Sequence, residues 1–176
     1  MLFEELPIAG AFVVLIETIS DERGFFARSW SAEEFQTHGL NPALVEISIS
    51  FNEVAGTLRG MHYQVAPYEE AKLVRCTKGS IFDVVLDLRR SSPTFRQSAG
   101  VDLTGANRKA LYVPEGCAHG FMSLEAGTEV LYQISTRHVP EAAAGVRWDD
   151  PAFAIQWPGV PSRVSRRDRA FPDFEE

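Results

Sequence analysis

The chain has 176 residues, 45% of them hydrophobic, which is enough for one well-filled core and short for two, so we expect a single domain over residues 1–176. A formal net charge of −7 at pH 7 argues against a general nucleic-acid binder or an anionic-membrane binder, because both need an excess of Lys and Arg. Any anionic ligand must therefore meet a local basic pocket.

The first residues lack the basic region and apolar run of a signal peptide, and no segment is long and apolar enough to span a bilayer. Cys76 and Cys117 have neither metal-site spacing nor a disulfide pattern, which favours reduced, buried thiols. These observations predict a soluble cytoplasmic protein.

Residues Ala11–Thr18 form the first predicted strand, and a helix signal follows it. Ser31 and Glu34 form a capping box, and Gly39 suits a helix C-terminus, so a short helix is expected at about residues 32–38.

Apolar and β-branched runs then recur at short spacing, with turn signals such as Lys78-Gly79 between them. This pattern predicts an all-β sandwich or barrel, and the Pro-, Arg- and Asp-rich sequence beyond Pro140 predicts an irregular segment that wraps around it. The further expected strands are Leu44–Ser50, Thr57–Gln64, Lys72–Thr77, Ser80–Leu88, Val101–Leu103, Lys109–Val113, His119–Leu124 and Thr128–Ser135.

Two histidines, His62 and His119, lie in apolar, strand-like stretches bracketed by glycines. Such a histidine can be a metal ligand, a general base or a buried structural partner. The Pro-x-Gly-x-x-His pattern that ends at His119 resembles the second motif of the cupin barrel, and Gly56 followed by His62 resembles the first.

A metal-dependent cupin oxygenase or isomerase is the weakest of the readings. Metal cupins carry His-x-His and then a glutamate a few residues on, whereas this chain has His62-Tyr63-Gln64. The nearest acidic residues, Glu69 and Glu70, lie farther along the sequence than the glutamate of that motif. Because iron, manganese and zinc sites usually need three or more converging ligands, we expect no metal.

Without a metal, the residue types around His62 suggest proton transfer. Removing a proton next to a carbonyl needs a base, a cation near the developing enolate oxygen and an acid that returns a proton, and His62, Lys72 and Tyr132 supply these roles. Each also has a structural reading: a hydrogen-bonded core histidine, a solvated amine and ordinary barrel packing.

Ten short stretches of the sequence resemble the motifs of a single enzyme family. They are Asp21–Phe26, Gly56–Gln64, Lys72–Arg75, Asp83–Arg89, Ser92–Thr94, Val113–Gly116 with Ala118–Phe121, Tyr132, Trp148–Pro151, Ile155–Pro158 and Ser165–Asp168. Together they resemble the dTDP-4-dehydrorhamnose 3,5-epimerase family over almost the whole chain. The resemblance implies a metal-free, cofactor-independent cupin-type jelly roll. It also implies a homodimer in which an N-terminal segment reaches into the partner's site.

Carried over residue by residue, the resemblance makes His62 the base and Asp168 its orienting carboxylate, with Asp83 as an alternative or additional support. Lys72 becomes the enolate stabiliser and Tyr132 the acid on the opposite face of the sugar. The implied substrate-binding residues are Arg23, Phe26, Arg28, Arg59, Gln64, Arg75 and His119.

The chain also departs from the family at positions expected to read the substrate. Arg28 stands where a glutamate is common, residues 46–52 replace a Gln-Asp-Asn type of segment, and Glu69 and Glu70 replace glutamines. Epimerisation of a single carbon, a related nucleotide sugar, or sugar-nucleotide binding without catalysis therefore stay open as alternatives.

Overall fold

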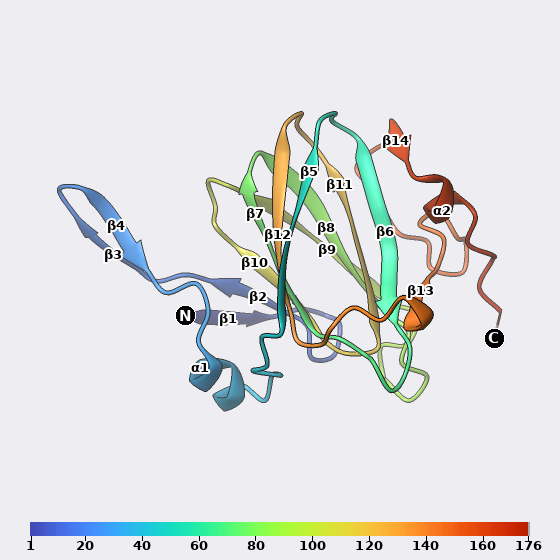
Figure 1. The fold of residues 1–176 in the computed structure, drawn as a ribbon, viewed down its shortest axis with the longest axis horizontal. Helices are drawn as coiled ribbons and strands as arrows, with labels where there is room; N and C mark the ends of the chain where they lie inside the picture. Colours follow the sequence, from blue (N-terminus) through green and yellow to red (C-terminus); the bar gives the residue numbers. More distant parts are fainter. Residues whose placement is uncertain (176) are drawn as a thin grey trace.

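Two antiparallel sheets face each other as a jelly roll in the computed structural model, which describes residues 1–175 (Figure 1). The first sheet has the order β1 (Leu2–Glu5), β2 (Phe12–Leu15), β10 (Ala110–Val113), β7 (Lys72–Lys78), β12 (Thr128–Ile134) and β5 (Glu46–Asn52). The second has the order β13 (Ala143–Gly145), β6 (Thr57–Gln64), β11 (Cys117–Ser123), β8 (Ser80–Asp87) and β9 (Ser98–Thr104), and β14 (Arg163–Val164) pairs with β6 in parallel. The predicted all-β architecture is confirmed.

A hairpin of β3 (Thr18–Asp21) and β4 (Gly24–Ala27) projects away from the barrel (Figure 1). The predicted strand Ala11–Thr18 is wrong in its extent, because the chain leaves the first sheet after β2 and resumes as β3, whose only partner strand is β4. The strands β1, β4, β13 and β14 were not predicted, and β3 was predicted only at its first residue, Thr18. The strands expected after residue 43 all form, with ends that differ by a few residues.

The predicted helix is present as α1 (Ala32–Thr37), and the hydroxyl of Ser31 accepts a hydrogen bond from the backbone N–H of Glu34. The segment after residue 139 is mostly irregular, as expected, and contains only η1 (Pro140–Ala142), β13, β14 and α2 (Arg166–Arg169). None of the helices in residues 1–175 is long and apolar enough to cross a membrane.

Side chains alternate between the interior and the outer face of each sheet, as the period of two in a strand requires. On β7, Val74 and Cys76 point into the core between the sheets, whereas Leu73 packs on the outside against the α1 side chain Phe35. Lys72 has the same parity as Val74 and so belongs to the interior. Cys76 and Cys117 are both buried and unpaired, and burial raises the pKa of the Cys76 thiol to about 11.

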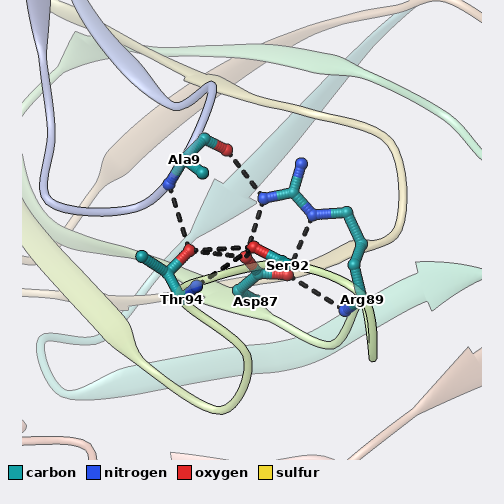
Figure 2. Close-up of polar contacts among 5 residues, drawn as sticks. All are labelled: Ala9, Asp87, Arg89, Ser92 and Thr94. Atoms are coloured by element: carbon teal, nitrogen blue, oxygen red, sulfur yellow. Dashed lines mark hydrogen bonds and ion pairs between the residues drawn. The ribbon is translucent and has the colours of Figure 1, made fainter.

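At the end of β8, the carboxylate of Asp87 is fully buried and collects hydrogen bonds from three side chains (Figure 2). Arg89 Nη2 and Thr94 Oγ1 both donate to Asp87 Oδ2 at 2.7 Å, and the Ser92 hydroxyl donates to the same oxygen. Arg89 Nη2 also donates to the carbonyl of Ala9 at 2.7 Å. The cluster therefore fastens the loop between β1 and β2 to the end of β8.

Candidate active site

A cavity of about 720 Å³ lies between the two sheets, where β5, β6, β7, β11 and β12 meet residues 162–169. Its volume is in the range of roughly 300–1,000 Å³ that is usual for small-molecule sites. Among the side chains that line it are His62, Lys72, His119, Tyr132, Arg59 and Asp168. The structure thus brings together all four residues expected to transfer or stabilise charge.

His62 is held by Asp168, which comes from the short helix α2. Asp168 Oδ1 lies 2.7 Å from His62 Nε2, and Asp168 Oδ2 accepts a hydrogen bond from the backbone N–H of Gly60 at 3.3 Å. Ser165 caps α2 by accepting from the Asp168 N–H at 3.0 Å, which fixes the carboxylate in turn. Burial opposes ionisation, but the hydrogen bonds from His62 and Gly60 outweigh it and lower the pKa of Asp168. The pair is therefore a charged carboxylate held at one ring nitrogen of an imidazole.

The other ring nitrogen of His62, Nδ1, has no hydrogen-bond partner in the described part of the chain, and the side chain is 38% exposed where it lines the cavity. The ring of Phe171 stands edge-on to the imidazole, with ring centroids 6.2 Å apart. One nitrogen is thus fixed by Asp168, and the ring is left with one nitrogen that can accept a proton.

Two glycines allow β6 and β11 to approach closely beside this histidine. Gly60 has a φ of +137°, and a Cβ on it would lie 2.5 Å from the Cα of Gly120. Because both residues lack a side chain, the strands come together and pair His62 directly with His119.

His119 forms a second histidine–carboxylate pair, deeper in the barrel. Its Nε2 lies 2.6 Å from Asp83 Oδ1, and both side chains are buried. Asp83 Oδ2 is buried without a hydrogen-bond partner, and burial raises the pKa of this carboxyl group. Of the two carboxylates considered for His62, Asp168 contacts it, and Asp83 contacts His119 instead.

Lys72 and Tyr132 come from the facing sheet, on the adjacent strands β7 and β12. The Lys72 ammonium donates to the carbonyl oxygen of His62 at 3.3 Å and lies 2.8 Å from the carboxylate of Glu70. The ring of Tyr132 is edge-on to His119 at 5.9 Å, and desolvation raises the pKa of its phenol well above the ordinary value. Tyr132 therefore holds its proton at neutral pH.

Arginines supply the basic pocket that the acidic chain needs. Arg59 lines the cavity, and its guanidinium donates to Asn52 Oδ1 at 2.9 Å and to the carbonyl of Phe51 at 3.2 Å. Sequence reasoning missed three further arginines of the lining, although four arginines within residues 163–169 of an acidic chain were a usable signal. They are Arg163, Arg167 and Arg169.

Three predicted substrate-binding residues lie far from the cavity of their own chain. Arg23 and Phe26 are on the projecting hairpin, where the Arg23 side chain is 83% exposed and Phe26 is 75% exposed. Arg28 follows the hairpin and pairs with Glu34 at 3.3 Å.

The structure places Gln64 and Arg75 outside the cavity lining as well. The Gln64 amide donates to the carbonyls of Tyr68 and Arg137 and accepts from the N–H of Val139, so backbone groups occupy it. Arg75 has the opposite parity to Lys72 on β7 and donates to the carbonyl of Ser29 on the outer side. These contacts give both residues a structural role within the single chain.

Within residues 1–175, no group of three or more His, Cys, Asp or Glu side chains comes together in a way that could hold a metal ion. Each barrel histidine instead has one nitrogen engaged by one carboxylate. The imidazole, phenol and ammonium groups that line the cavity are of the types that proton-transfer enzymes use, and the jelly roll that carries them is of the cupin type.

The chain belongs to the dTDP-4-dehydrorhamnose 3,5-epimerase family, whose model matches residues 5–176. It is 37% identical over 177 residues to the dTDP-4-dehydrorhamnose 3,5-epimerase of Sinorhizobium fredii, covering 100% of this chain and 91% of that one. The crystal structure of the enzyme of that name from Elizabethkingia anophelis matches with a TM-score of 0.95 and 32% identity, over 99% of this chain and 96% of the other. ChmJ, a 3'-monoepimerase from Streptomyces bikiniensis in complex with dTDP-quinovose, matches with a TM-score of 0.87 and 30% identity, over 96% and 85% of the two chains.

Proposed function

We propose that this protein inverts carbons 3 and 5 of a dTDP-linked 4-keto-6-deoxyhexose by removing a proton next to the ketone and returning one from the opposite face. The observation that carries the proposal is the His62–Asp168 pair, 2.7 Å apart, at a cavity that Lys72 and Tyr132 enter from the facing sheet. Family membership supports the substrate class.

Inversion needs a base and an acid on opposite faces of the sugar ring. His62 projects from β6 of one sheet and Tyr132 from β12 of the other, so a ligand between the sheets meets them from opposite sides. His62 Nδ1 takes the proton from carbon, the electron pair of the broken C–H bond forms the C=C bond of an enolate, and the π pair of the ketone moves onto its oxygen. The ketone then re-forms as the C=C pair takes the phenolic proton of Tyr132 on the opposite face of the same carbon. The resulting imidazolium and phenolate then exchange protons with water, which restores both groups.

A single cation can assist both epimerisations. Carbons 3 and 5 both flank the ketone at carbon 4, so loss of a proton from either one places negative charge on the same oxygen. Lys72 is the cation at that position, because its buried ammonium faces the cavity beside the backbone of His62. His119, held by Asp83, adds a second hydrogen-bonding group near the sugar.

The diphosphate of the substrate fits the arginines of the rim. Arg59, Arg163, Arg167 and Arg169 line the same cavity, and an arginine guanidinium matches the oxygens of a phosphate bidentately. They form a local basic pocket in a chain of net charge −7.

The exposed apolar residues of the hairpin and of the edge strand β5 support a homodimer as part of the proposal. Ile19 and Phe26 are 74% and 75% exposed on the hairpin, and Ile47, Ile49 and Phe51 on β5 are each at least 53% exposed. An edge strand with such side chains is a template for another chain, and the projecting hairpin can carry Arg23 and Phe26 into the site of a second copy.

The free thiols of Cys76 and Cys117 fit the cytoplasmic location expected from the sequence.

Epimerisation of carbon 3 alone is the second candidate, because a 3'-monoepimerase shares this fold over 96% of the chain. The same four residues serve one carbon as well as two, so the geometry of the proton-transfer groups is compatible with both. Orientation of the sugar within the cavity decides between them.

Incubation with dTDP-4-keto-6-deoxyglucose in heavy water tests both candidates. Deuterium at carbons 3 and 5 of the product supports the double epimerase, and deuterium at carbon 3 alone supports the monoepimerase. Tight binding without any deuterium entry would leave the protein as a sugar-nucleotide-binding module. The variant His62→Ala, with an unchanged circular dichroism spectrum, is the matched control and should show no exchange.

A further inference from the structure

Within residues 1–175, the Glu70 carboxylate forms one ion pair, and it is with Lys72. Glu70 Oε1 lies 2.8 Å from Lys72 Nζ, and the two side chains are 10% and 9% exposed. Lys72 lines the cavity, but Glu70 is not among the described residues that do so. Any effect of Glu70 on a bound sugar therefore passes through the lysine.

A lysine ammonium has three N–H donors, and the backbone carbonyl of His62 accepts from one of them at 3.3 Å. The carboxylate of Glu70 forms an ion pair with the same nitrogen, with Oε1 2.8 Å from Nζ. These two contacts hold the nitrogen in place. Because Lys72 lines the cavity, the remaining donors are available to a ligand oxygen.

Glu70 is itself fixed by the neighbouring strand end. Ala71 donates its N–H to the hydroxyl of Ser135 at 2.8 Å, and Ser135 returns its N–H to the carbonyl of Ala71 at 3.0 Å. The hydroxyl of Thr136 also donates to the carbonyl of Glu69 at 2.9 Å. Three hydrogen bonds thus hold the backbone on both sides of Glu70, so its carboxylate is a rigid anchor and not the end of a free loop.

We propose that Glu70 is a positioning residue that aims the ammonium of Lys72 at the ketone oxygen of the substrate. This inference rests on the proposed function, since it assigns a task to Lys72 in enolate stabilisation. A flexible lysine side chain would otherwise have to be ordered at each turnover, and a preorganised donor avoids that cost in the transition state. The ion pair also compensates a buried ammonium while the cavity is empty.

Three variants at position 70 distinguish the effect of holding the Lys72 ammonium in place from the effect of the negative charge of Glu70. Glu70→Gln keeps the side-chain length and a polar oxygen beside the ammonium, so kcat should stay within about threefold of the wild type. Glu70→Asp keeps the charge but shortens the side chain by one methylene, which moves the carboxylate away from the ammonium. Glu70→Ala removes the carboxylate. Both variants should lower kcat by about 10- to 100-fold, as losses of orienting partners commonly do. KM should change by less than about threefold, because Glu70 does not touch the ligand. Glu69→Ala is the matched control, since its carboxylate has no partner in residues 1–175.

The readout is deuterium entry at carbons 3 and 5 in heavy water, followed together with the melting temperature of each variant. Both carbons should slow by the same factor in Glu70→Asp, because both enolates share one oxygen. Wild-type rates of deuterium entry in Glu70→Ala would overturn the proposal. A lower rate in Glu70→Gln than in Glu70→Asp would also overturn it, because the charge of residue 70 would then matter more than its position. If Glu70→Ala does not fold, the order of the Gln and Asp variants still decides. Absence of exchange in the wild type would instead refute the proposed function.

Discussion

The carboxylate of Asp168 lies 2.7 Å from Nε2 of His62, although the two residues are 106 positions apart in the sequence. Asp168 reaches the histidine because α2 begins at the capping residue Ser165 and because Gly60 offers its N–H to the second carboxylate oxygen. The contact decides which nitrogen of the ring faces the cavity. It therefore sets the direction of proton transfer.

Asp168→Asn should lower kcat by about 100-fold or more with little change in KM, because an amide oriented by Gly60 and Ser165 can present its NH₂ group to the ring and select the wrong tautomer. Steady-state kinetics at several pH values measure the effect. Ser162→Ala, at another residue that lines the cavity, is the control and should stay within a few-fold of the wild type. An Asn variant with wild-type kcat would remove Asp168 from the mechanism.

Tyr132→Phe should separate proton removal from inversion. Without the phenol, His62 can still take the proton and return one to the same face, so exchange with heavy water persists while the configuration is retained. Net epimerisation should fall by about 100-fold or more, in the range typical of losing a general acid. Mass spectrometry measures the label, and NMR couplings of the ring protons report the configuration. Equal losses of exchange and epimerisation would show that Tyr132 does more than protonate.

The Asp87 cluster predicts a pH-dependent stability. Burial opposes ionisation of Asp87, but the hydrogen bonds from Arg89, Ser92 and Thr94 outweigh it and hold the pKa of this carboxyl group well below its usual range. Since the pKa in the unfolded chain is about 3.9, the stabilisation is complete above roughly pH 5 and is lost progressively as the pH falls further.

Asp87→Asn should therefore cost about 2 kcal/mol in the free energy of unfolding at pH 7, and less near pH 3.5. Urea unfolding at the two pH values measures the difference. Asp102→Asn, at an exposed position on β9, should change stability by less than about 0.5 kcal/mol at either pH. A cost for Asp87→Asn that is the same at both pH values would show that the charge of Asp87 contributes nothing.

The sequence predicted what depends on local pattern. The strands from β5 to β12 and the helix α1 follow from alternation, turn residues and a capping box, all of which act within a few residues. The hairpin of β3 and β4 was missed because its apolar residues are exposed, so they read as a continuation of the strand before them. Whether the apolar residues of a strand are buried depends on the whole fold, so the local pattern could not separate this hairpin from the strand before it.

The site residues also divide into those that the local sequence suggests and those that depend on the whole fold. His62, Lys72 and Tyr132 were proposed from their residue types, and Asp168 from family resemblance, because a contact across 106 residues leaves no local pattern. Arg75 was expected at the substrate, but the parity of β7 turns it to the outer face. Arg163 was missed because it reaches the cavity through the parallel pairing of β14 with β6.

Mixed dimers test whether the hairpin completes the site of a second copy. The double variant Arg23→Ala/Phe26→Ala should lose most activity, since neither residue contacts the cavity of its own chain and both are exposed on the hairpin. His62→Ala should be inactive because it lacks the base. When the two chains are co-expressed in equal amounts, half of the dimers are mixed and each has one intact site, so about one quarter of the wild-type activity should return.

Mixing the two purified proteins without subunit exchange is the control, and it should give only the sum of their separate activities. Size-exclusion chromatography with light scattering checks that the wild type and each variant form the proposed dimer. If co-expression restores nothing although mixed dimers form, the hairpin serves its own chain or the interface alone. Recovery requires that the arginine and the phenylalanine of one copy act at the histidine of the other, which is the arrangement that the exposed hairpin and the apolar edge of β5 favour.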